Sequence, residues 1–170
     1  LGLSEADHYR KSDACLGSTV GRNANRMKNA QFDLWGKTVQ LPCNEGSNNL
    51  HSGPDCFYLR MWKTIAAEED SVTFELQSPH GDQGFPGNAV IRVTYTLDNA
   101  DALHITYDAI CDQDTVFNMT NHSYWNLNGH ANGFIYDHDL QIHADSFFPV
   151  DEKTIEYMKA HWPSDVKPEW

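Results

Sequence analysis

The sequence has few basic residues, because only 12 Lys and Arg stand against 24 Asp and Glu in 170 residues. The resulting formal net charge of −12 at pH 7 repels the phosphates of DNA and RNA. Long apolar runs are missing as well: Phe147–Val150 is a typical one, far shorter than the ~20 residues of a membrane span. We therefore expect neither a nucleic-acid partner nor a membrane segment, and no signal peptide.

Cysteine is scarce and is not arranged for metal or disulfide chemistry. No CxxC pair occurs, and the four residues are unevenly spaced: Cys15, Cys43, Cys56 and Cys111. Their pattern predicts thiols in a reducing compartment, and hence a cytoplasmic protein. His138 and His143 lie near acidic residues, but no HxH or HExxH pair is present, so no metal is expected.

Helical periodicity is nearly absent, and only 151–160 is a candidate helix. Apolar and polar residues alternate in 71–77, and the same pattern in 89–97 and 102–110 predicts a hairpin. A second hairpin is expected over 32–41 with its turn at Trp35–Lys37, and further strands are expected near these ranges: 16–21, 60–67, 115–120 and 137–143. The sequence thus predicts an all-β sandwich or barrel, in a single domain over residues 1–170.

Four polar loops separate the predicted strands, and such loops are where a β-sandwich usually binds a ligand. They are Gly21–Arg26, Asn44–Gly53, Gly81–Gly87 and Thr120–Leu127. The glycine-rich third loop lacks the lysine and the strand–loop–helix setting of a phosphate cradle, so nucleotide binding is not expected.

These loops carry a specific resemblance to a known family. The order and spacing of GRNANR, NLHSG, HGDQGFPG and TNHSYWNL resemble the aldose 1-epimerases, also called galactose mutarotases. The resemblance runs from about residue 15 to 155, roughly the middle half of a family member. It implies a large twisted antiparallel β-sandwich, the galactose mutarotase-like supersandwich, present here as an incomplete copy. It also implies an aldohexose substrate, interconversion of the α and β anomers of D-galactose or D-glucose, and no cofactor.

The resemblance also implies roles for two histidines. The histidine of TNHSYWNL, His122, corresponds to the general acid of the family. His51 of NLHSG corresponds to the second histidine of the cleft, with a catalytic and a substrate-binding role. Without the resemblance, each would more often be a structural histidine. One departure lies beside His51, because Ser52 stands where the family usually has glycine.

Four further residues resemble substrate contacts of the family, namely Asn25, Arg26, Ser123 and Tyr124. Arginine and asparagine supply directional hydrogen bonds to vicinal hydroxyls, and an aromatic ring suits the C–H face of a sugar. Arg26 could instead pair with a surface acid, and Asn25 could be a turn residue with positive φ. If the roles hold, Asn25, Arg26, His51 and His122 should converge in one cleft.

Mutarotation opens a cyclic hemiacetal, so it needs one group to protonate the ring oxygen and a second to accept the C1 hydroxyl proton. In the family the second group is a glutamate near the C-terminus, and no segment here resembles its surroundings. Glu156 and Glu169 are available carboxylates but are not assigned as the base. The alternative function is therefore a sugar-binding β-sandwich module, or an epimerase-like pseudo-enzyme, without the catalytic glutamate. A phosphorylated hexose is a weaker alternative because of the acidic charge. The sequence indicates neither the preferred hexose nor the oligomeric state.

Overall fold

The computed structural model describes residues 2–12, 14–146 and 152. Contacts divide the chain into two compact units, Leu1–Gly133 and Phe134–Trp170, and every helix and strand named below belongs to the first. The single domain expected over residues 1–170 remains a prediction. The strands are β1 (Thr19–Val20), β2 (Arg26–Met27), β3 (Gln31–Leu34), β4 (Lys37–Gln40), β5 (Asn49–Leu50), β6 (Lys63–Ala67), β7 (Ser71–Ser78), β8 (Ala89–Leu97), β9 (Leu103–Cys111) and β10 (Thr120–Asn121).

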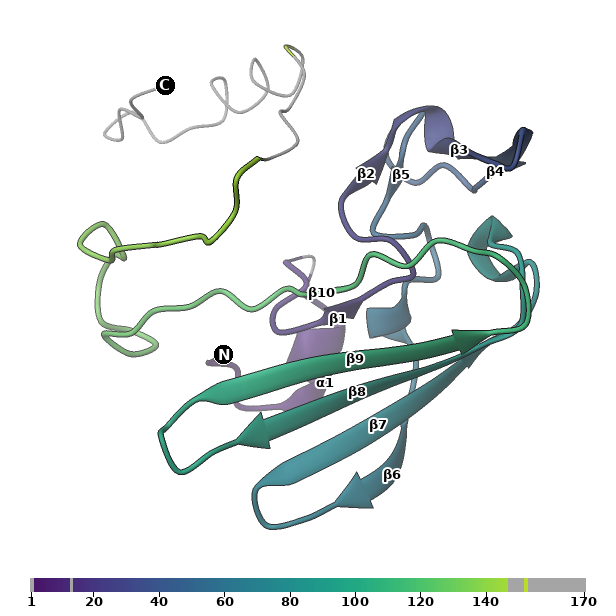
Figure 1. Ribbon diagram of the computed structural model, residues 1–170. Coiled ribbons are helices and arrows are strands. Elements are labelled where there is room, and N and C mark those ends of the chain that lie inside the picture. Colours follow the sequence, from purple (N-terminus) through teal and green to yellow (C-terminus); the bar gives the residue numbers. More distant parts are fainter. Residues whose placement is uncertain (1, 13, 147–151, 153–170) are drawn as a thin grey trace. The chain divides into compact units, whose positions relative to one another are not determined.

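Strands β6 to β9 form one antiparallel four-stranded sheet in sequence order (Figure 1). The alternating residues of the sequence fall into register across it, so that Phe74 lies opposite Val93 and Val93 opposite Tyr107. One face carries these apolar side chains and the other carries residues such as Glu75 and Arg92, which form an ion pair. The predicted strands in 71–77 and the predicted 89–110 hairpin are therefore confirmed.

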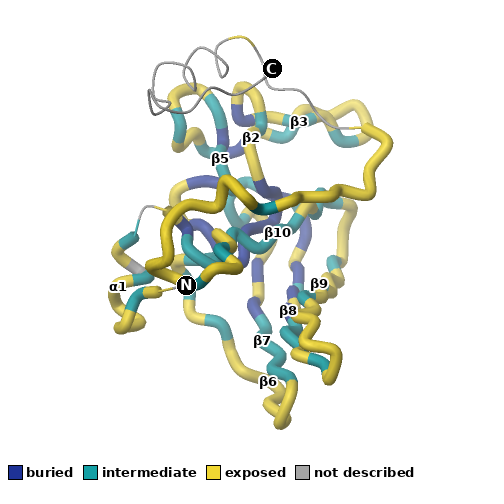
Figure 2. The backbone as a smooth tube through the Cα atoms, turned by 90° about the vertical axis from the view of Figure 1, so that its left-hand side faces the viewer, coloured by how far each residue is buried: buried dark blue, intermediate teal, exposed yellow. Residues whose placement is uncertain are grey.

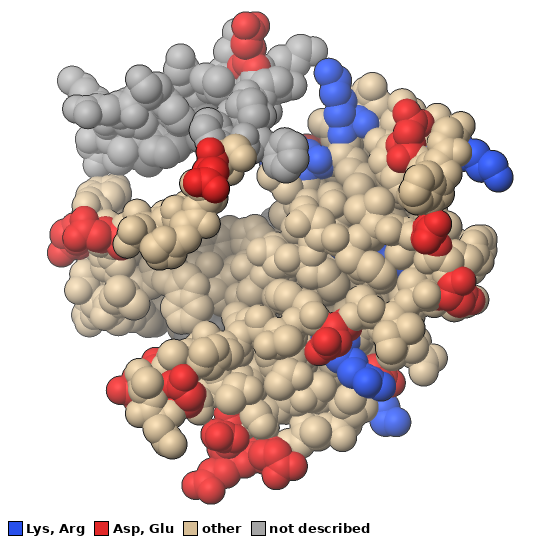
Figure 3. Space-filling view, viewed as in Figure 1, with Lys and Arg blue, Asp and Glu red and all other residues tan. Residues whose placement is uncertain are grey.

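The apolar face of this sheet holds the larger core. Buried Phe57, Leu76, Ala89 and Ile91 pack together there. Phe57 comes from η2 (Phe57–Leu59), one of three 3-10 turns with η1 (Lys28–Ala30) and η3 (Asp82–Gly84). Figure 2 shows that burial is concentrated at one end of β7 and β8, whereas the far ends of the hairpins are exposed. Acidic side chains gather at those far ends (Figure 3).

Strands β3 and β4 form the second predicted hairpin. Trp35 and Gly36 connect them with positive φ values of 52° and 76°, the geometry of a two-residue type I′ turn. A smaller core of Ala30, Leu41 and Phe85 lies at the base of this hairpin.

One expectation fails near the end of the described residues, and a second lies almost wholly outside them. Residues 137–143 form no strand, and Leu140 and Ile142 are 85% and 71% exposed. A strand needs a neighbour to pair its backbone, and none lies beside these residues in the second unit as described. Helix α1 (Ala6–Arg10) was not expected, and the candidate helix over 151–160 lies outside the described residues except for Glu152. Among the described residues, no helix is long and apolar enough to cross a membrane.

Candidate functional site

Two short ladders carry three of the four polar loops, all except Gly81–Gly87. Strand β1 pairs with β10, and β2 pairs with β5, each through two residue pairs. Between them opens a cleft of about 600 Å³. Its lining includes all six residues named from the sequence: Asn25, Arg26, His51, His122, Ser123 and Tyr124. Residues from three separate segments of the chain are thus brought together in one place.

The backbone of His122 is held on both sides by the segment that leads into β1. His122 follows β10 directly, and its N–H donates to the carbonyl oxygen of Ser18 at 2.8 Å. Its own carbonyl oxygen accepts from the N–H of Gly17 at 3.1 Å. The β1–β10 ladder therefore sets where the imidazole lies.

His51 follows β5 and is fixed by the loop that contains Asn25. The Asn25 N–H donates to Nδ1 of His51 at 3.1 Å, and the His51 N–H donates to the Asn25 carbonyl oxygen at 3.0 Å. Because Nδ1 accepts a hydrogen bond, the neutral ring carries its proton on Nε2. The ring centroids of His51 and His122 lie 5.3 Å apart, and the two rings are perpendicular to each other.

Burial lowers the pKa of His51, and the positive charges of His122 and Arg26 lower this pKa further, against an opposing effect of Glu45. The neutral form of His51 is therefore favoured near pH 7.

Arg26 lies on β2 and makes a two-pronged ion pair. Its Nε and Nη2 donate to the two carboxylate oxygens of Glu45 at 2.7 and 2.5 Å. These hydrogen bonds lower the pKa of Glu45. Asn25 has a φ of 63°, and its side-chain oxygen accepts from the Arg26 N–H at 2.8 Å, so Asn25 also serves as a turn residue.

Ser123 and Tyr124 continue the chain past His122. The ring of Tyr124 lies 5.2 Å from the His122 ring with a tilt of 44°, and its side chain is 56% exposed. Its aromatic face can therefore meet a ligand in the cleft. No Asp or Glu is among the described residues that line the cleft, and Glu156 and Glu169 lie outside the part of the chain that is described.

Two buried residues behind the cleft were missed by the sequence analysis. The hydroxyl of Ser52 donates to the Asn23 carbonyl oxygen at 2.8 Å and accepts from the Asn23 N–H at 2.7 Å. It thus joins the two loops that carry His51 and Arg26. The departure from glycine at this position was the available signal.

Arg22, which is 1% exposed, was the second missed residue. Its guanidinium donates to the hydroxyl and carbonyl oxygens of Ser78, to the carbonyl oxygens of Pro86 and Gly87, and to the hydroxyl of Thr115. Desolvation lowers its pKa from a very high value. Nothing in the sequence distinguishes this arginine from Arg26 in the same loop.

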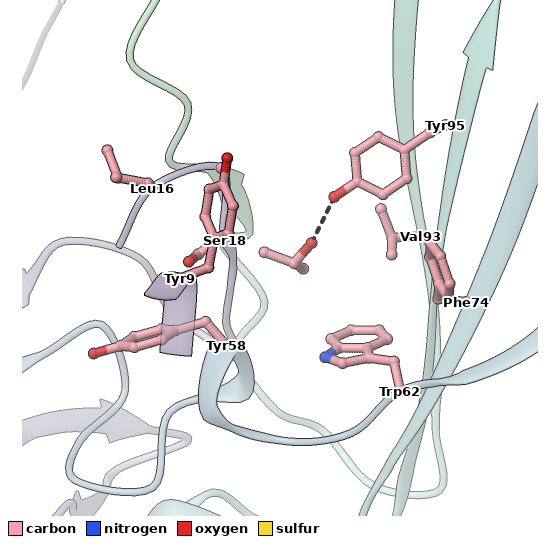
Figure 4. Close-up of a pocket in the computed structure, with 10 residues that line it drawn as sticks. Tyr9, Leu16, Ser18, Tyr58, Trp62, Phe74, Val93 and Tyr95 are labelled. Carbon is pink, nitrogen blue, oxygen red and sulfur yellow. Dashed lines mark hydrogen bonds between the residues drawn. The ribbon is translucent and has the colours of Figure 1, made fainter. Parts of the chain in front are cut away.

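A second hollow of about 500 Å³ lies against the apolar face of the main sheet and is lined mainly by aromatic and apolar side chains, including Tyr9, Tyr58, Trp62, Phe74 and Tyr95 (Figure 4). It contains no His, Asp or Glu among its described lining. A smaller cavity of about 170 Å³ adjoins His51 and His122 and contains Cys56, whose pKa is raised by burial. That thiol stays protonated, and the smaller cavity shares His51, His122 and Tyr124 with the cleft, so its acid–base groups are those of the cleft.

Within the described residues, no group of three His, Cys, Asp or Glu is placed to hold a metal ion. All four cysteines are described, and none forms a disulfide. The chemistry available in the cleft is therefore that of two adjacent imidazoles, an arginine and hydrogen-bonding polar groups.

The chain is similar in sequence and in structure to known proteins. The family model described as aldose 1-epimerase matches residues 1–167. An aldose 1-epimerase of Haemophilus influenzae is 43% identical over 89% of this chain and 44% of its own length. A galactose mutarotase of Sus scrofa is 42% identical over 91% of this chain and 45% of its own length. The chain thus spans less than half the length of these curated relatives.

The solved structure of an aldose epimerase homologue from C. elegans superposes with a TM-score of 0.71 and 39% identity, covering 76% of this chain and 40% of that one. A galactose 1-epimerase from Lactobacillus acidophilus gives a TM-score of 0.68 and 34% identity, covering 75% and 39%. The predicted mutarotase-like fold, rich in antiparallel β-sheet, is confirmed. From its loops, its cleft and these relatives, the chain belongs to the aldose 1-epimerase family.

Proposed function

We propose that the protein is an aldose 1-epimerase that interconverts the α and β anomers of D-galactose or D-glucose. One observation carries the proposal: the ring centroids of His51 and His122 lie 5.3 Å apart in a cleft that also contains Arg26. A hexose fits a cleft of about 600 Å³.

In the proposed reaction His122 is the general acid. It donates a proton to the ring oxygen while a carboxylate accepts the proton of the C1 hydroxyl, so the C1–O5 bond breaks and an aldehyde forms. Rotation about C1–C2 presents the other face of the aldehyde. The C5 hydroxyl then attacks C1, returns its proton to His122, and the carboxylate returns the other proton to the new C1 hydroxyl. No net proton or electron is exchanged.

The other cleft residues have binding roles in this proposal. Since Nδ1 of His51 accepts a hydrogen bond from Asn25, its Nε2–H is the group that donates to a sugar hydroxyl. Arg26 supplies further donors, with its guanidinium oriented by Glu45. The exposed ring of Tyr124 offers a surface to the C–H face of the sugar.

A second candidate function is sugar binding without turnover. It is favoured by the lack of a carboxylate among the described lining residues of the cleft. The two functions differ in whether the natural protein supplies a positioned base. A test that measures both sugar binding and anomer exchange on the same preparation therefore distinguishes the two functions.

The test uses the complete natural protein that contains this sequence. Polarimetry of freshly dissolved α-D-galactose should show accelerated mutarotation, and His122→Asn should lower kcat by about 10²–10⁴-fold with a smaller change in KM. His104→Asn is the matched control, because His104 lies on β9, pairs with Asp98 and is absent from the cleft lining. An unchanged kcat in His122→Asn would remove this residue from the acid role. Galactose binding without any acceleration would favour the sugar-binding alternative.

A further inference from the structure

The main sheet is tied to the β1–β10 ladder by one tyrosine hydroxyl. Tyr95 lies on β8, and its hydroxyl forms a 2.9 Å hydrogen bond with Oγ1 of Thr19 on β1, drawn as the dashed line in Figure 4. Thr19 is buried and is paired in register with Asn121 on β10. The bond therefore connects the most regular part of the molecule to the strand pair that carries His122.

Asn121 extends this connection to both sides of His122. Its Nδ2 donates to the Tyr95 hydroxyl at 3.4 Å and to the Gly17 carbonyl oxygen at 3.2 Å. Its Oδ1 accepts from the N–H of Ser123 at 3.0 Å. One side chain thus restrains the residue after His122 and the segment to which the backbone of His122 is bonded.

We propose that the Tyr95 hydroxyl is a positioning group for His122, acting through Thr19 and Asn121. The inference rests on the proposed function, in which His122 is the general acid. Tyr95 lines the aromatic hollow on the sheet and is absent from the cleft lining, so it does not touch a sugar bound in the cleft. Its effect on the reaction passes through the position of the imidazole.

The chain offers a matched control on the neighbouring strand. Tyr107 lies on β9 on the same face of the sheet, opposite Val93, and its hydroxyl is buried without a hydrogen-bond partner among the described residues. Tyr107→Phe removes a hydroxyl that forms no hydrogen bond with any described residue. Tyr95→Phe removes the same atom from a side chain whose hydroxyl bonds to Thr19 and Asn121. Its ring keeps the edge-on packing against Phe74, with the ring centroids 6.3 Å apart.

The kinetic test compares these variants in the complete natural protein. Tyr95→Phe should lower kcat roughly tenfold with KM changed by less than about twofold, because a displaced acid matters mainly in the transition state. Thr19→Val should act in the same direction, and the double variant should lose less than the product of the two single losses. Tyr107→Phe should keep kcat within about twofold of the parent protein. Equal kcat values for Tyr95→Phe and Tyr107→Phe would overturn the proposal.

A sugar-free measurement separates this inference from the proposed function. In nitrogen-15 spectra of histidine side chains, the His122 signals are assigned by their loss in His122→Asn. We expect these signals to shift in Tyr95→Phe and to stay in place in Tyr107→Phe. If the natural protein lacks epimerase activity, the proposed function fails, but the spectra still decide whether Tyr95 positions His122. Unshifted His122 signals in Tyr95→Phe would overturn the positioning role even in an active enzyme.

Discussion

His51 shows how the surroundings of one side chain set its charge. It is half-buried, it accepts a hydrogen bond at Nδ1, and the Arg26 guanidinium and the His122 ring lie near it. Each of these features disfavours the imidazolium form, and burial has the largest effect on its pKa. The same ring is exposed to water when the chain unfolds, so its protonation links folding to pH.

The stability of the fold should accordingly fall as the solution is acidified. Because the pKa of His51 is lower in the folded than in the unfolded protein, the unfolded chain binds a proton first, starting near the ordinary value of about 6.5. Between that value and the folded pKa, protonation favours unfolding. Urea midpoints measured from pH 7.5 to 5 should decline, and they should decline less in His51→Gln. Equal slopes for the two proteins would contradict the depressed pKa.

The Arg26–Glu45 pair gives a second prediction at this scale. Both side chains are partly exposed, at 44% and 35%, so Glu45→Gln should change the free energy of unfolding by less than about 1 kcal/mol. The guanidinium would lose a two-pronged partner beside the cleft, and KM for galactose should rise several-fold. Urea unfolding measures the change in stability, and polarimetry measures the change in KM. A large loss of stability would show that the pair has a structural role instead.

Among the elements, the loop before β2 is organised by Arg22. Its guanidinium donates hydrogen bonds to carbonyl and hydroxyl oxygens at the end of β7, in the loop before β8 and in the loop before β10. The rings of Phe85 and Phe117 lie over it, each 5.7 Å from the guanidinium carbon. The positions of Asn25 and Arg26 in the same loop depend on this anchor.

Replacing the anchor should therefore be costly. Arg22→Met leaves several buried acceptors without donors, and we expect a loss of about 3 kcal/mol or more in the free energy of unfolding. Arg22→Lys keeps the charge but not the planar fork, and its loss should be intermediate. Arg92→Met is the control, because Arg92 makes an exposed pair with Glu75 and should cost less than about 1 kcal/mol. Urea unfolding measures the free energy of unfolding of all three variants. Equal losses in Arg22→Met and Arg92→Met would contradict the anchoring role of Arg22.

For the whole molecule, the main sheet leaves apolar side chains in water. Leu97, Leu103 and Ile110 are 55%, 46% and 73% exposed, although they lie on long, regular strands. The chain also spans only about 45% of relatives such as the Sus scrofa galactose mutarotase. An uncovered apolar sheet surface promotes association.

The 170-residue chain expressed alone should therefore associate and show little mutarotase activity. Because the described lining of the cleft contains no carboxylate, we expect the C1 proton to pass to water and the barrier to rise by ~3–5 kcal/mol. Light scattering tests the association, and polarimetry tests the activity. A monomeric chain with rapid anomer exchange would show that a carboxylate within it, Glu156 or Glu169 first, acts as the base.

The regular strands and the identity of the cleft residues could be predicted from the sequence. In β7, β8 and β9 the alternation of residues such as Val93, Thr94 and Tyr95 is a local property that decides which side chains face the core. The motifs around His51 and His122 were likewise visible as short local patterns. The strand predicted near 137–143 is wrong, because a strand forms only where another strand pairs with it.

Long-range contacts were decided by the tertiary structure alone. The sequence does not show that Arg22 is buried while Arg26 stays at the surface, since both belong to one short polar loop. Nor does it show that the hydroxyl of Tyr95 bonds to Thr19 and Asn121 while that of Tyr107 has no hydrogen-bond partner in the described part of the chain. Composition and periodicity determine which residues are apolar and which face they share. Which hydroxyl finds a partner depends on how distant segments pack, and only the folded chain brings those segments together.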